Sequence, residues 1–494
     1  ARLARGGAAS AAIVGGGVTV YLVGAGPGDP GLLTLRGREL LERCDALVYD
    51  RLADPRIVAM ANPSAERIYA GKEAGRHALT QEETNALLIE LGGRRACVVR
   101  LKGGDPFIFG RGGEEALALQ AAGVEWEVVP GISSAYAVPA YAGIPVTQRG
   151  MAAQVTVVTG HEDPTKPESD LDWPSLAAAP GTLVFLMGVG ALAHNAERLI
   201  AAGKPPDTPA AVIASGTRPG QRTVTARLDA IAEAAAGLQP PAITLVGEVA
   251  SLHERLSWFE RRPLFGRRVV VTRARPQASA LAARLSELGA DVVEAPAIVI
   301  EPLPFQPPDL GSYDVVCLTS ANGVERLLDG DVRVLHGVTV AAVGRATEAA
   351  IADRGIIADV VAEQAVQESL VEALGDVAGR RVLVATAEGA RPVLSDGLRQ
   401  RGAEVDVLHL YRTRREPVDA DAVMAADLVT FTSSSTVTNV LGALDGRDLG
   451  SLRAVSIGPV TSGTLREHGV EPLIEADPHD VEGLVEAVLR AAVQ

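Results

Sequence analysis

Short apolar runs rich in β-branched residues alternate with longer amphipathic segments along this chain. The run VTVYLVG from Val18 is typical of a buried strand, and the helix signal after it begins only beyond a Pro-Gly pair, in DPGLLTLRGRELLERC. Strand-like runs return in DALVYD, CVVRLK, LVFLMG and VVVTRAR, and each is followed by a loop or an Ala-rich helical segment. This alternation predicts an α/β protein.

A glycine-rich loop, GAGPGD from Gly24 to Asp29, follows the first run. A dinucleotide-binding turn needs a glycine where this chain has Asp29, whose carboxylate would repel a diphosphate. Pro27 also removes one backbone N–H donor from the loop. We therefore expect either an ordinary tight turn or a loop whose backbone lies close to a ligand other than a diphosphate.

The composition excludes several classes of protein. A chain of 494 residues is long enough for two to four domains. Its 46 Lys and Arg against 61 Asp and Glu give a net charge of −15, which argues against nucleic-acid binding. An anionic small substrate stays open, because it needs only a few local cations. No apolar run has the length of a membrane span.

The cysteines and histidines indicate neither disulfides nor a metal site. Cys44, Cys97 and Cys317 are far apart, and the last two lie in apolar runs, so we expect reduced, buried thiols and a cytoplasmic protein. No CxxC or HExxH occurs, and the eight histidines lack zinc spacing, so we expect no metal.

The chain divides once. We expect a disordered leader at 1–17, a first domain at 18–260, a linker at 261–265 and a second domain at 266–494. The division falls in LHERLSWFERRPLFGRR, a charged, aromatic and proline-containing joint, after which a new strand begins.

The second domain contains an internal repeat. GRRVVVTRAR from Gly266 is echoed by GRRVLVATAE from Gly379, and SYDVVCLTS from Ser312 by AADLVTFTS from Ala425, both displaced by 113 residues. The repeat predicts two α/β lobes of like topology, one for each copy, that face each other across a cleft.

Hydroxyl groups follow equivalent strands of the two copies and begin helices. Such hydroxyls suit the carboxylates of a ligand, although Ser and Thr are also ordinary helix caps. The candidates are Thr319, Ser320, Thr432, Ser433, Ser434 and Ser435.

Several motifs of the first half, in order and spacing, resemble the uroporphyrinogen-III C-methyltransferases of the tetrapyrrole methylase family: GAGPGDPGLLTL, YDRL, GKEAG, RLKGGDPFIFGRGGEE and VVPGISSA. The second half resembles uroporphyrinogen-III synthases in VVVTRAR, LTSANGV, LYRT, FTSSSTV and SIGPVT. The resemblance implies a two-lobed tetrapyrrole methylase fold followed by a two-lobed α/β synthase domain.

The first resemblance implies S-adenosyl-L-methionine as the cofactor. Asp105 would accept a hydrogen bond from an ammonium or ribose hydroxyl, and Ile108 and Met187 would contact the adenine. The family often has Thr-Ala where this chain has Ser133 and Ser134, which keeps the hydroxyl. The implied contacts are Pro27, Gly103, Gly104, Asp105, Ile108, Ser133, Ser134, Met187 and Gly216.

The implied reaction is the double C-methylation of uroporphyrinogen III to precorrin-2. By resemblance, Asp50 is the proton acceptor and Lys72 the proton donor, while Arg111 and Arg149 are candidate clamps for substrate carboxylates. If the resemblance is set aside, the sequence is also compatible with ordinary roles: Asp50 as a turn cap, Lys72 as a solvated charge, and each arginine as one partner of a surface ion pair.

The second resemblance implies closure of hydroxymethylbilane to uroporphyrinogen III with loss of water. Tyr411 in HLYRT is the implied acid, although a tyrosine at a strand end is more often a packing residue.

The expected partners are these tetrapyrroles, with no nucleic acid and no membrane, and a homodimer through the methyltransferase half. The implied pathways are porphyrin, siroheme and cobalamin biosynthesis. Two alternatives stay open: another tetrapyrrole methylase with a non-catalytic tetrapyrrole-binding module, or a relative acting on ribosomal RNA or protein, against which the charge and the long motifs speak.

Overall fold

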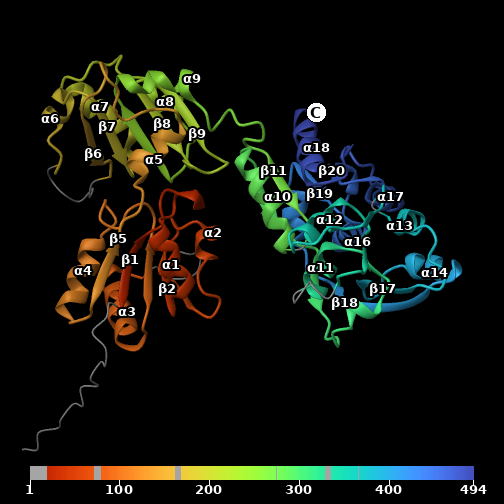
Figure 1. Ribbon diagram of the computed structural model, residues 1–494. Helices are drawn as coiled ribbons and strands as arrows, with labels where there is room; N and C mark the ends of the chain where they lie inside the picture. Colours follow the sequence, from red (N-terminus) through yellow and green to blue (C-terminus); the bar gives the residue numbers. More distant parts are fainter. Residues whose placement is uncertain (1–18, 72–78, 162–168, 274, 329–334, 365) are drawn as a thin grey trace, which may run out of the picture. The chain divides into compact units, whose positions relative to one another are not determined.

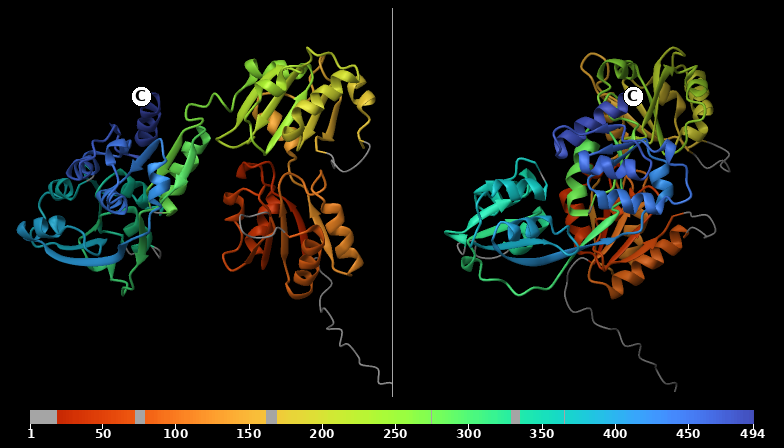
Figure 2. Two further views of the ribbon diagram at one scale, coloured as in Figure 1. Left: turned by 180° about the vertical axis from the view of Figure 1, so that it is seen from behind. Right: turned by 90° about the vertical axis from the view of Figure 1, so that its right-hand side faces the viewer.

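The computed structural model describes residues 19–71, 79–161, 169–273, 275–328, 335–364 and 366–494. The leader expected at 1–17 and the candidate Lys72 lie outside these residues. Contacts divide the chain into two units, Ala1–Gly266 and Arg267–Gln494, and each is described by itself. Each unit contains two sheets flanked by helices (Figures 1 and 2).

The first sheet of unit 1 is parallel, in the order β3-β2-β4-β1-β5. Its strands are β1 (Val20–Gly24), β2 (Ala46–Tyr49), β3 (Glu66–Tyr69), β4 (Val98–Lys102) and β5 (Trp126–Val129). Its helices are α1 (Leu35–Arg43), α2 (Pro55–Val58), α3 (Gln81–Arg94) and α4 (Gly112–Ala121), whereas the next helix, α5 (Ser134–Tyr141), packs on the second sheet of the unit.

The two faces of this sheet have separate cores. Alternate residues of β1 and β4 pack with α1 and α2 on one face and with α3 and α4 on the other. Gly24 at the end of β1 pairs with Lys102 at the end of β4. This register brings the GAGPGD loop beside the GGDP loop, at the carboxyl end where parallel sheets bind ligands.

The second sheet of unit 1 is mixed, in the order β6-β7-β10-β8-β9, with only the β6–β7 pair parallel. Its strands are β6 (Val155–Thr159), β7 (Thr182–Leu186), β8 (Pro209–Ala214), β9 (Arg222–Arg227) and β10 (Ala242–Val246). Its helices are α6 (Trp173–Ala178), α7 (Leu192–Ala201), α8 (Ile231–Ala234) and α9 (His253–Leu256).

Unit 2 consists of an outer lobe, built from both ends of its chain, and an inner lobe, built from the middle. The outer sheet has the order β12-β11-β19-β20-β21, from β11 (Arg268–Val271), β12 (Asp291–Glu294), β19 (Leu428–Phe431), β20 (Ala454–Ser456) and β21 (Ile474–Glu475). Its helices are α10 (Arg275–Glu287), α15 (Ala420–Met424), α16 (Ser434–Ala443), α17 (Pro459–Glu467) and α18 (Val481–Val493).

The inner sheet has the order β13-β18-β17-β14-β15-β16. Its strands are β13 (Ile298–Pro302), β14 (Val315–Leu318), β15 (Thr339–Ala342), β16 (Val360–Val361), β17 (Arg381–Ala387) and β18 (Glu404–Arg415). Its helices are α11 (Ala321–Leu327), α12 (Arg345–Ala352), α13 (Gln367–Ala373) and α14 (Val393–Gln400).

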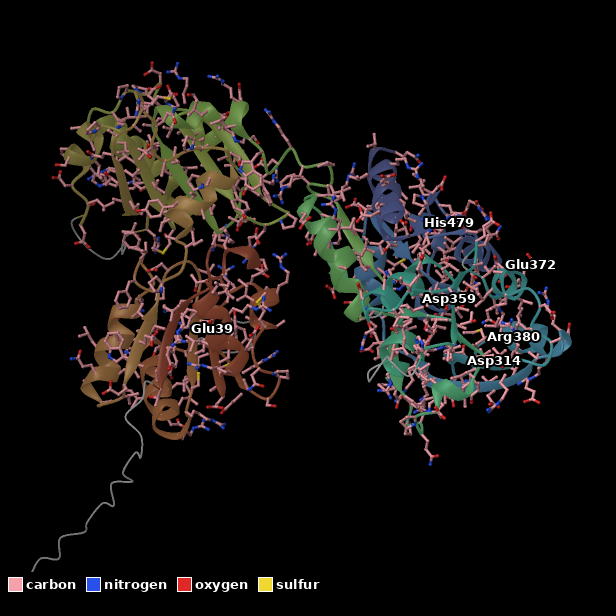
Figure 3. All side chains as sticks on the ribbon, in the orientation of Figure 1. Glu39, Asp314, Asp359, Glu372, Arg380 and His479 are labelled. Atoms are coloured by element: carbon pink, nitrogen blue, oxygen red, sulfur yellow. The ribbon has the colours of Figure 1, made fainter. Side chains whose placement is uncertain are left out.

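The expectation of one lobe for each sequence repeat is wrong. Each sheet joins the first strands of one copy to the later strands of the other, because β11 pairs with β19 and β17 with β14. Asp314, labelled in Figure 3, accepts the backbone N–H of Arg381 at 2.8 Å, and its repeat counterpart Asp427 accepts that of Arg268 at 2.7 Å. The two copies have therefore exchanged halves.

The cysteines are free, and Cys44 and Cys317 are buried as expected. The expectation that Cys97 is buried is wrong, because it is half-buried. Among the described residues, no helix is long and apolar enough to cross a membrane, and no group of His, Cys, Asp and Glu has the arrangement of a metal site.

Candidate functional site

Four glycines let the ends of β1, β4 and β5 approach one another. Gly26 and Gly104 exchange backbone hydrogen bonds of 3.1 and 2.7 Å, which ties the two glycine loops together. A Cβ atom on Gly24 would lie 2.5 Å from the Cα of Gly131 and 2.6 Å from the carbonyl oxygen of Gly104. A side chain at this crossing would push the loops apart, so glycine is required there.

Asp105 holds the GGDP loop in shape. Its Oδ1 accepts the backbone N–H of Phe107 at 2.8 Å, and its Oδ2 accepts that of Gly131 at 3.0 Å. The carboxylate thereby joins the end of β5 to the loop after β4. Each oxygen keeps a further lone pair, so these bonds are compatible with the expected contact to a ligand donor.

The remaining candidate cofactor contacts come from α5 and from loops of both lobes. Ser133 caps α5 by accepting the backbone N–H of Ala135 at 3.3 Å, and Ser134 is the first helical residue. Gly216 lies against α5, because a Cβ there would be 2.6 Å from a methyl group of Val138. Ile108 and Met187 expose 43% and 52% of their surface, whereas Pro27 is half-buried.

Backbone strain gathers at the same loops. All five non-glycine residues with positive φ in the described part of the chain are candidates or lie close to one in sequence, namely Phe109, Arg111, Met187, Ser215 and Thr217. Such conformations cost about 1–3 kcal/mol each and cluster at ligand sites. The loops around Ile108, Met187 and Gly216 therefore have strained backbone conformations of the kind found at ligand sites.

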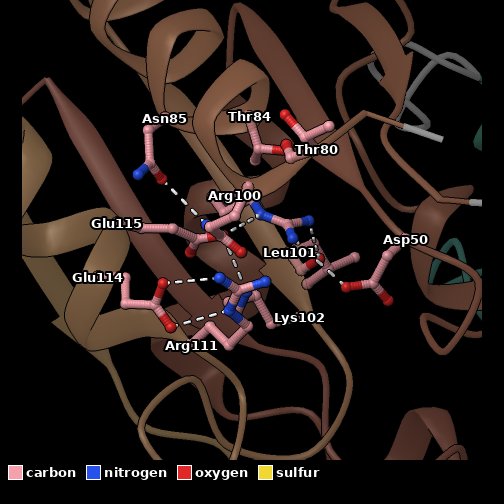
Figure 4. A network of polar contacts seen from close by, with 11 residues as sticks. Asp50, Thr80, Thr84, Asn85, Arg100, Leu101, Lys102, Arg111, Glu114 and Glu115 are labelled. Carbon is pink, nitrogen blue, oxygen red and sulfur yellow. Dashed lines mark hydrogen bonds and ion pairs between the residues drawn. The ribbon is translucent and has the colours of Figure 1, made fainter. Parts of the chain in front are cut away.

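Asp50 lies beside a buried network of charges (Figure 4). Its Oδ1 accepts the backbone N–H of Leu52 at 3.0 Å, and its Oδ2 lies 3.5 Å from the guanidinium of Arg100. Arg100 and Lys102, on the α3–α4 face of β4, both contact Glu115 Oε1, at 3.1 and 2.9 Å. Burial lowers the pKa of Lys102, and the positive charge of Arg100 lowers it further.

The candidate substrate clamps are both exposed. Arg111 forms a bidentate ion pair with Glu114, with distances of 2.7 and 2.8 Å, so a substrate carboxylate would compete with this partner. Arg149 lies in a turn closed by Gln148 and Ala152.

In unit 2, Tyr411 and Ser320 come together. The buried Tyr411 hydroxyl lies 2.8 Å from Ser320 Oγ, which also accepts the backbone N–H of Gly323 and caps α11. Thr319 donates to the carbonyl of Ala385 at 3.0 Å. These residues belong to the inner lobe.

The other hydroxyls belong to the outer lobe, at the end of β19. Ser433 caps α16 and lies 3.0 Å from the exposed Ser435. Ser434 accepts a hydrogen bond from Thr464 at 2.7 Å, and Thr432 is half-buried. Ser320 and Ser433 each cap a helix, one in each lobe. The ordinary capping role that the sequence analysis left open therefore applies to these two residues.

Comparison with known proteins identifies both halves. The profile of the Tetrapyrrole (Corrin/Porphyrin) Methylases matches residues 19–232, and that of Uroporphyrinogen-III synthase HemD matches residues 279–486. The porphyrin biosynthesis protein HemD of Ruminiclostridium josui is 36% identical over 494 residues, covering 95% of this chain and 97% of that protein. The chain belongs to the tetrapyrrole methylase and uroporphyrinogen-III synthase families.

Two further relatives match the tetrapyrrole methylase half. An S-adenosyl-L-methionine-dependent uroporphyrinogen III methyltransferase of Methanosarcina barkeri is 55% identical over 239 residues, covering 48% of this chain and 94% of that protein. The structure of uroporphyrin-III C-methyltransferase from Thermus thermophilus with S-adenosylhomocysteine is 42% identical with a TM-score of 0.42, covering 47% of this chain and 99% of that one. The two profiles and the full-length relative confirm the family expected from the sequence, and the two helix-flanked sheets of each unit confirm the expected α/β fold class.

Sequence reasoning missed the buried charges beside the candidate Asp50. Arg100, Lys102 and Glu115 lie within RLKGGDPFIFGRGGEE, yet none was a candidate. The sequence signal that could have revealed them is the pair of cations two positions apart in an otherwise apolar strand. Two such buried cations require a buried carboxylate on the same face of the sheet.

Proposed function

We propose that unit 2 closes hydroxymethylbilane to uroporphyrinogen III, and that unit 1 transfers two methyl groups to that product from S-adenosyl-L-methionine, giving precorrin-2. The observation that carries this proposal is the coincidence of glycine contacts and strained residues with the positions that the methyltransferase resemblance implies for the cofactor. Relatives of both halves that are named for these activities support it.

The residues present fit the cofactor. When bound, S-adenosyl-L-methionine supplies a methyl group activated by a sulfonium. The backbone of Gly104 is open to close approach, because a Cβ there would meet no atom nearer than 3.8 Å, whereas Gly103 lies against Leu52. The exposed side chains of Ile108 and Met187 offer apolar surface to an adenine. Asp105 keeps lone pairs for an ammonium or hydroxyl while it holds its loop.

Proton transfer falls to groups at the end of β2 and in the segment after β3. A pyrrole carbon is already nucleophilic, so positioning supplies much of the rate. We assign Asp50 as the proton acceptor and Lys72 as the donor. Arg100 holds one oxygen of Asp50, which fixes the direction of its carboxylate. Arg111 and Arg149 bind substrate carboxylates from exposed positions.

In unit 2, Tyr411 donates the proton that lets hydroxide leave as water. Its hydrogen bond to Ser320 fixes the phenol, and Ser320 lies at the start of α11, where backbone donors favour an anionic group. Hydroxyls at Thr319 and at 432–435 bind substrate carboxylates in the inner and outer lobes.

The deciding experiment incubates the whole chain with hydroxymethylbilane and S-adenosyl-L-methionine and identifies the product. We expect dimethylated uroporphyrinogen III. Methylation of added uroporphyrinogen III without closure of the bilane would leave unit 2 as a non-catalytic binding module. Closure without inversion of the last ring would give the symmetric isomer and contradict the synthase assignment.

The proposal extends to the setting of the protein. We assign it to the cytoplasm, supported by three free thiols. It would serve siroheme and cobalamin biosynthesis as a multifunctional enzyme with domains at 18–260 and 266–494, joined by a linker at 261–265. A homodimer through the methyltransferase half is the assembly expected, and light scattering of the full chain tests it.

A further inference from the structure

Asp29, the residue that departs from the dinucleotide-binding pattern, is where three parts of unit 1 meet. Its Oδ1 accepts the backbone N–H of Gly31 at 2.8 Å and caps the short helix η1 (Pro30–Leu32). Its Oδ2 accepts the hydroxyl of Tyr141 at 2.7 Å, and its own N–H donates to Thr217 Oγ1 at 3.1 Å. The GAGPGD loop is thus fixed by α5 from one side and by the loop after β8 from the other.

An aromatic chain leads from this point to the joint between the two halves. The Tyr141 ring packs on Trp258 and Phe259, with centroids 5.1 and 4.9 Å apart. Phe259 is buried and packs on Phe265 at 5.4 Å. Trp258 donates its indole N–H to the carbonyl of Ala140 at 2.9 Å. Residues of the joint therefore support the ring whose hydroxyl holds Asp29.

A polar chain leads from the joint to the same aspartate by another route. Glu260 Oε1 accepts the side-chain N–H of Gln221 at 2.8 Å and the hydroxyl of Thr223. The buried Gln221 in turn accepts the backbone N–H of Thr217 at 2.8 Å through its Oε1. Thr217 is the strained residue beside Gly216 that accepts the N–H of Asp29.

We propose that residues 258–265 of the joint are part of the cofactor site of the methyltransferase, with Tyr141 and Glu260 as positioning residues for the GAGPGD loop and the loop at Gly216. The inference rests on the proposed function, because it takes these loops as cofactor contacts. The family profile ends at residue 232, so the joint lies beyond the part of the chain that it describes.

Two features favour positioning over simple packing. The aromatic series of contacts ends on the side chain of Asp29, and the polar series ends on its backbone N–H. Together they fix the orientation of the GAGPGD loop. Burial and the nearby Asp29 carboxylate raise the pKa of Tyr141, so its hydroxyl stays a donor at any pH used for an assay.

The test measures binding of S-adenosylhomocysteine to the full-length protein by calorimetry. Tyr141→Phe keeps the ring in the aromatic cluster and removes the donor. We expect at least about tenfold weaker binding, because tenfold corresponds to about 1.4 kcal/mol and a hydrogen bond to a charged group contributes about that much or more. The KM for S-adenosyl-L-methionine should rise in parallel while kcat stays unchanged. The matched control Tyr313→Phe removes a Tyr–Asp hydrogen bond of 2.9 Å in unit 2 and should leave this binding unchanged.

The polar chain has its own pair of variants. Glu260→Gln keeps the acceptor for Gln221 and should bind as the wild type, whereas Glu260→Ala removes it and should bind more weakly. Unchanged affinity in both Tyr141→Phe and Glu260→Ala, with a wild type that binds, would overturn this inference alone. A wild type that does not bind S-adenosylhomocysteine would overturn the proposed function and this inference with it.

Discussion

Two neighbouring glutamates of α4 offer a sharp test of how unit 1 is stabilised. Glu115 has no exposed side-chain surface and contacts Arg100 and Lys102, whose side chains are 7% and 5% exposed. Glu114 is 52% exposed and pairs with the exposed Arg111. The substitutions Glu115→Gln and Glu114→Gln remove the same charge one residue apart, in opposite environments.

The expected losses of stability differ by several kcal/mol. Removing one partner of a buried ion pair costs about 3–5 kcal/mol, because the remaining charge stays buried without compensation. Here Glu115→Gln leaves two buried cations that are balanced in part by Asp50, at 3.5 Å from Arg100, and by the exposed Glu114, which interacts with Lys102. An exposed pair such as Arg111–Glu114 contributes about 0–1 kcal/mol. For a unit of about 250 residues, each kcal/mol shifts the melting temperature by about 2–4 °C, so Glu115→Gln should lower it by about 10 °C.

Tryptophan fluorescence reports this melting selectively. The chain has three tryptophans, Trp126, Trp173 and Trp258, and all lie in unit 1. Their emission during heating therefore follows unit 1, while circular dichroism follows the whole chain. Equal melting shifts for the two variants would refute the assignment of Glu115 as the counter-charge of the buried cations.

The pH dependence gives the same reasoning a second check. Glu115 raises the pKa of Lys102 against the lowering effects of burial and Arg100, so Glu115→Gln should lower that pKa further below the unfolded value of about 10.4. Between the folded and unfolded pKa values the unfolded chain binds more protons, so stability rises with pH in that range. The deficit of Glu115→Gln relative to the wild type should therefore shrink as the pH is raised from neutral toward 9.5. A constant deficit would mean that Lys102 stays charged in the folded variant.

The other predictions concern the site residues and the thiols. Asp50→Asn should leave S-adenosylhomocysteine affinity unchanged and slow methylation strongly, and wild-type turnover would reduce Asp50 to a turn cap. Asp105→Ala should weaken that affinity in calorimetry, because the backbone N–H groups of Phe107 and Gly131 lose their acceptor; unchanged affinity would remove Asp105 from the site. Tyr411→Phe should slow ring closure while its circular dichroism melting curve stays close to that of the wild type; unchanged closure would make Tyr411 a packing residue. Burial raises the pKa of Cys44 to about 11 and that of Cys317 to about 12, so a thiol reagent at pH 8 should label both only after urea unfolding.

Local signals in the sequence predicted much of the fold. The glycines of GAGPGD and GGDP mark turns, because Gly26, Gly28 and Gly104 have positive φ. Thr319–Ser320 mark the start of a helix, because Ser320 caps it. Both requirements arise within a few residues of the chain. The role of Asp29 could not be predicted in this way. Its partners Tyr141 and Thr217 are 112 and 188 residues away, and only the folded chain brings them together.

The exchange between the sequence repeats was hidden for a different reason. Asp314 and Asp427 would make the same backbone contact whether each copy folded on itself or with the other copy. The similarity of the two copies shows that each makes this contact, but it does not show which copy supplies the strand that is contacted. The connections decide it, because β13 leads the first copy out of the outer lobe and β18 leads the second copy back, and the two strands pair antiparallel.

The exchanged halves also set an order of events during synthesis of the chain. The strands of the inner sheet lie within one continuous stretch, 298–415, so that lobe is complete once this stretch has left the ribosome. The outer sheet cannot form then, because β11 waits for β19, whose residues are made about 160 positions later. Until then, β11 and β12 present unpaired edges and apolar faces to the cell. Nascent chains stalled between residues 300 and 420 are therefore the ones most in need of a chaperone.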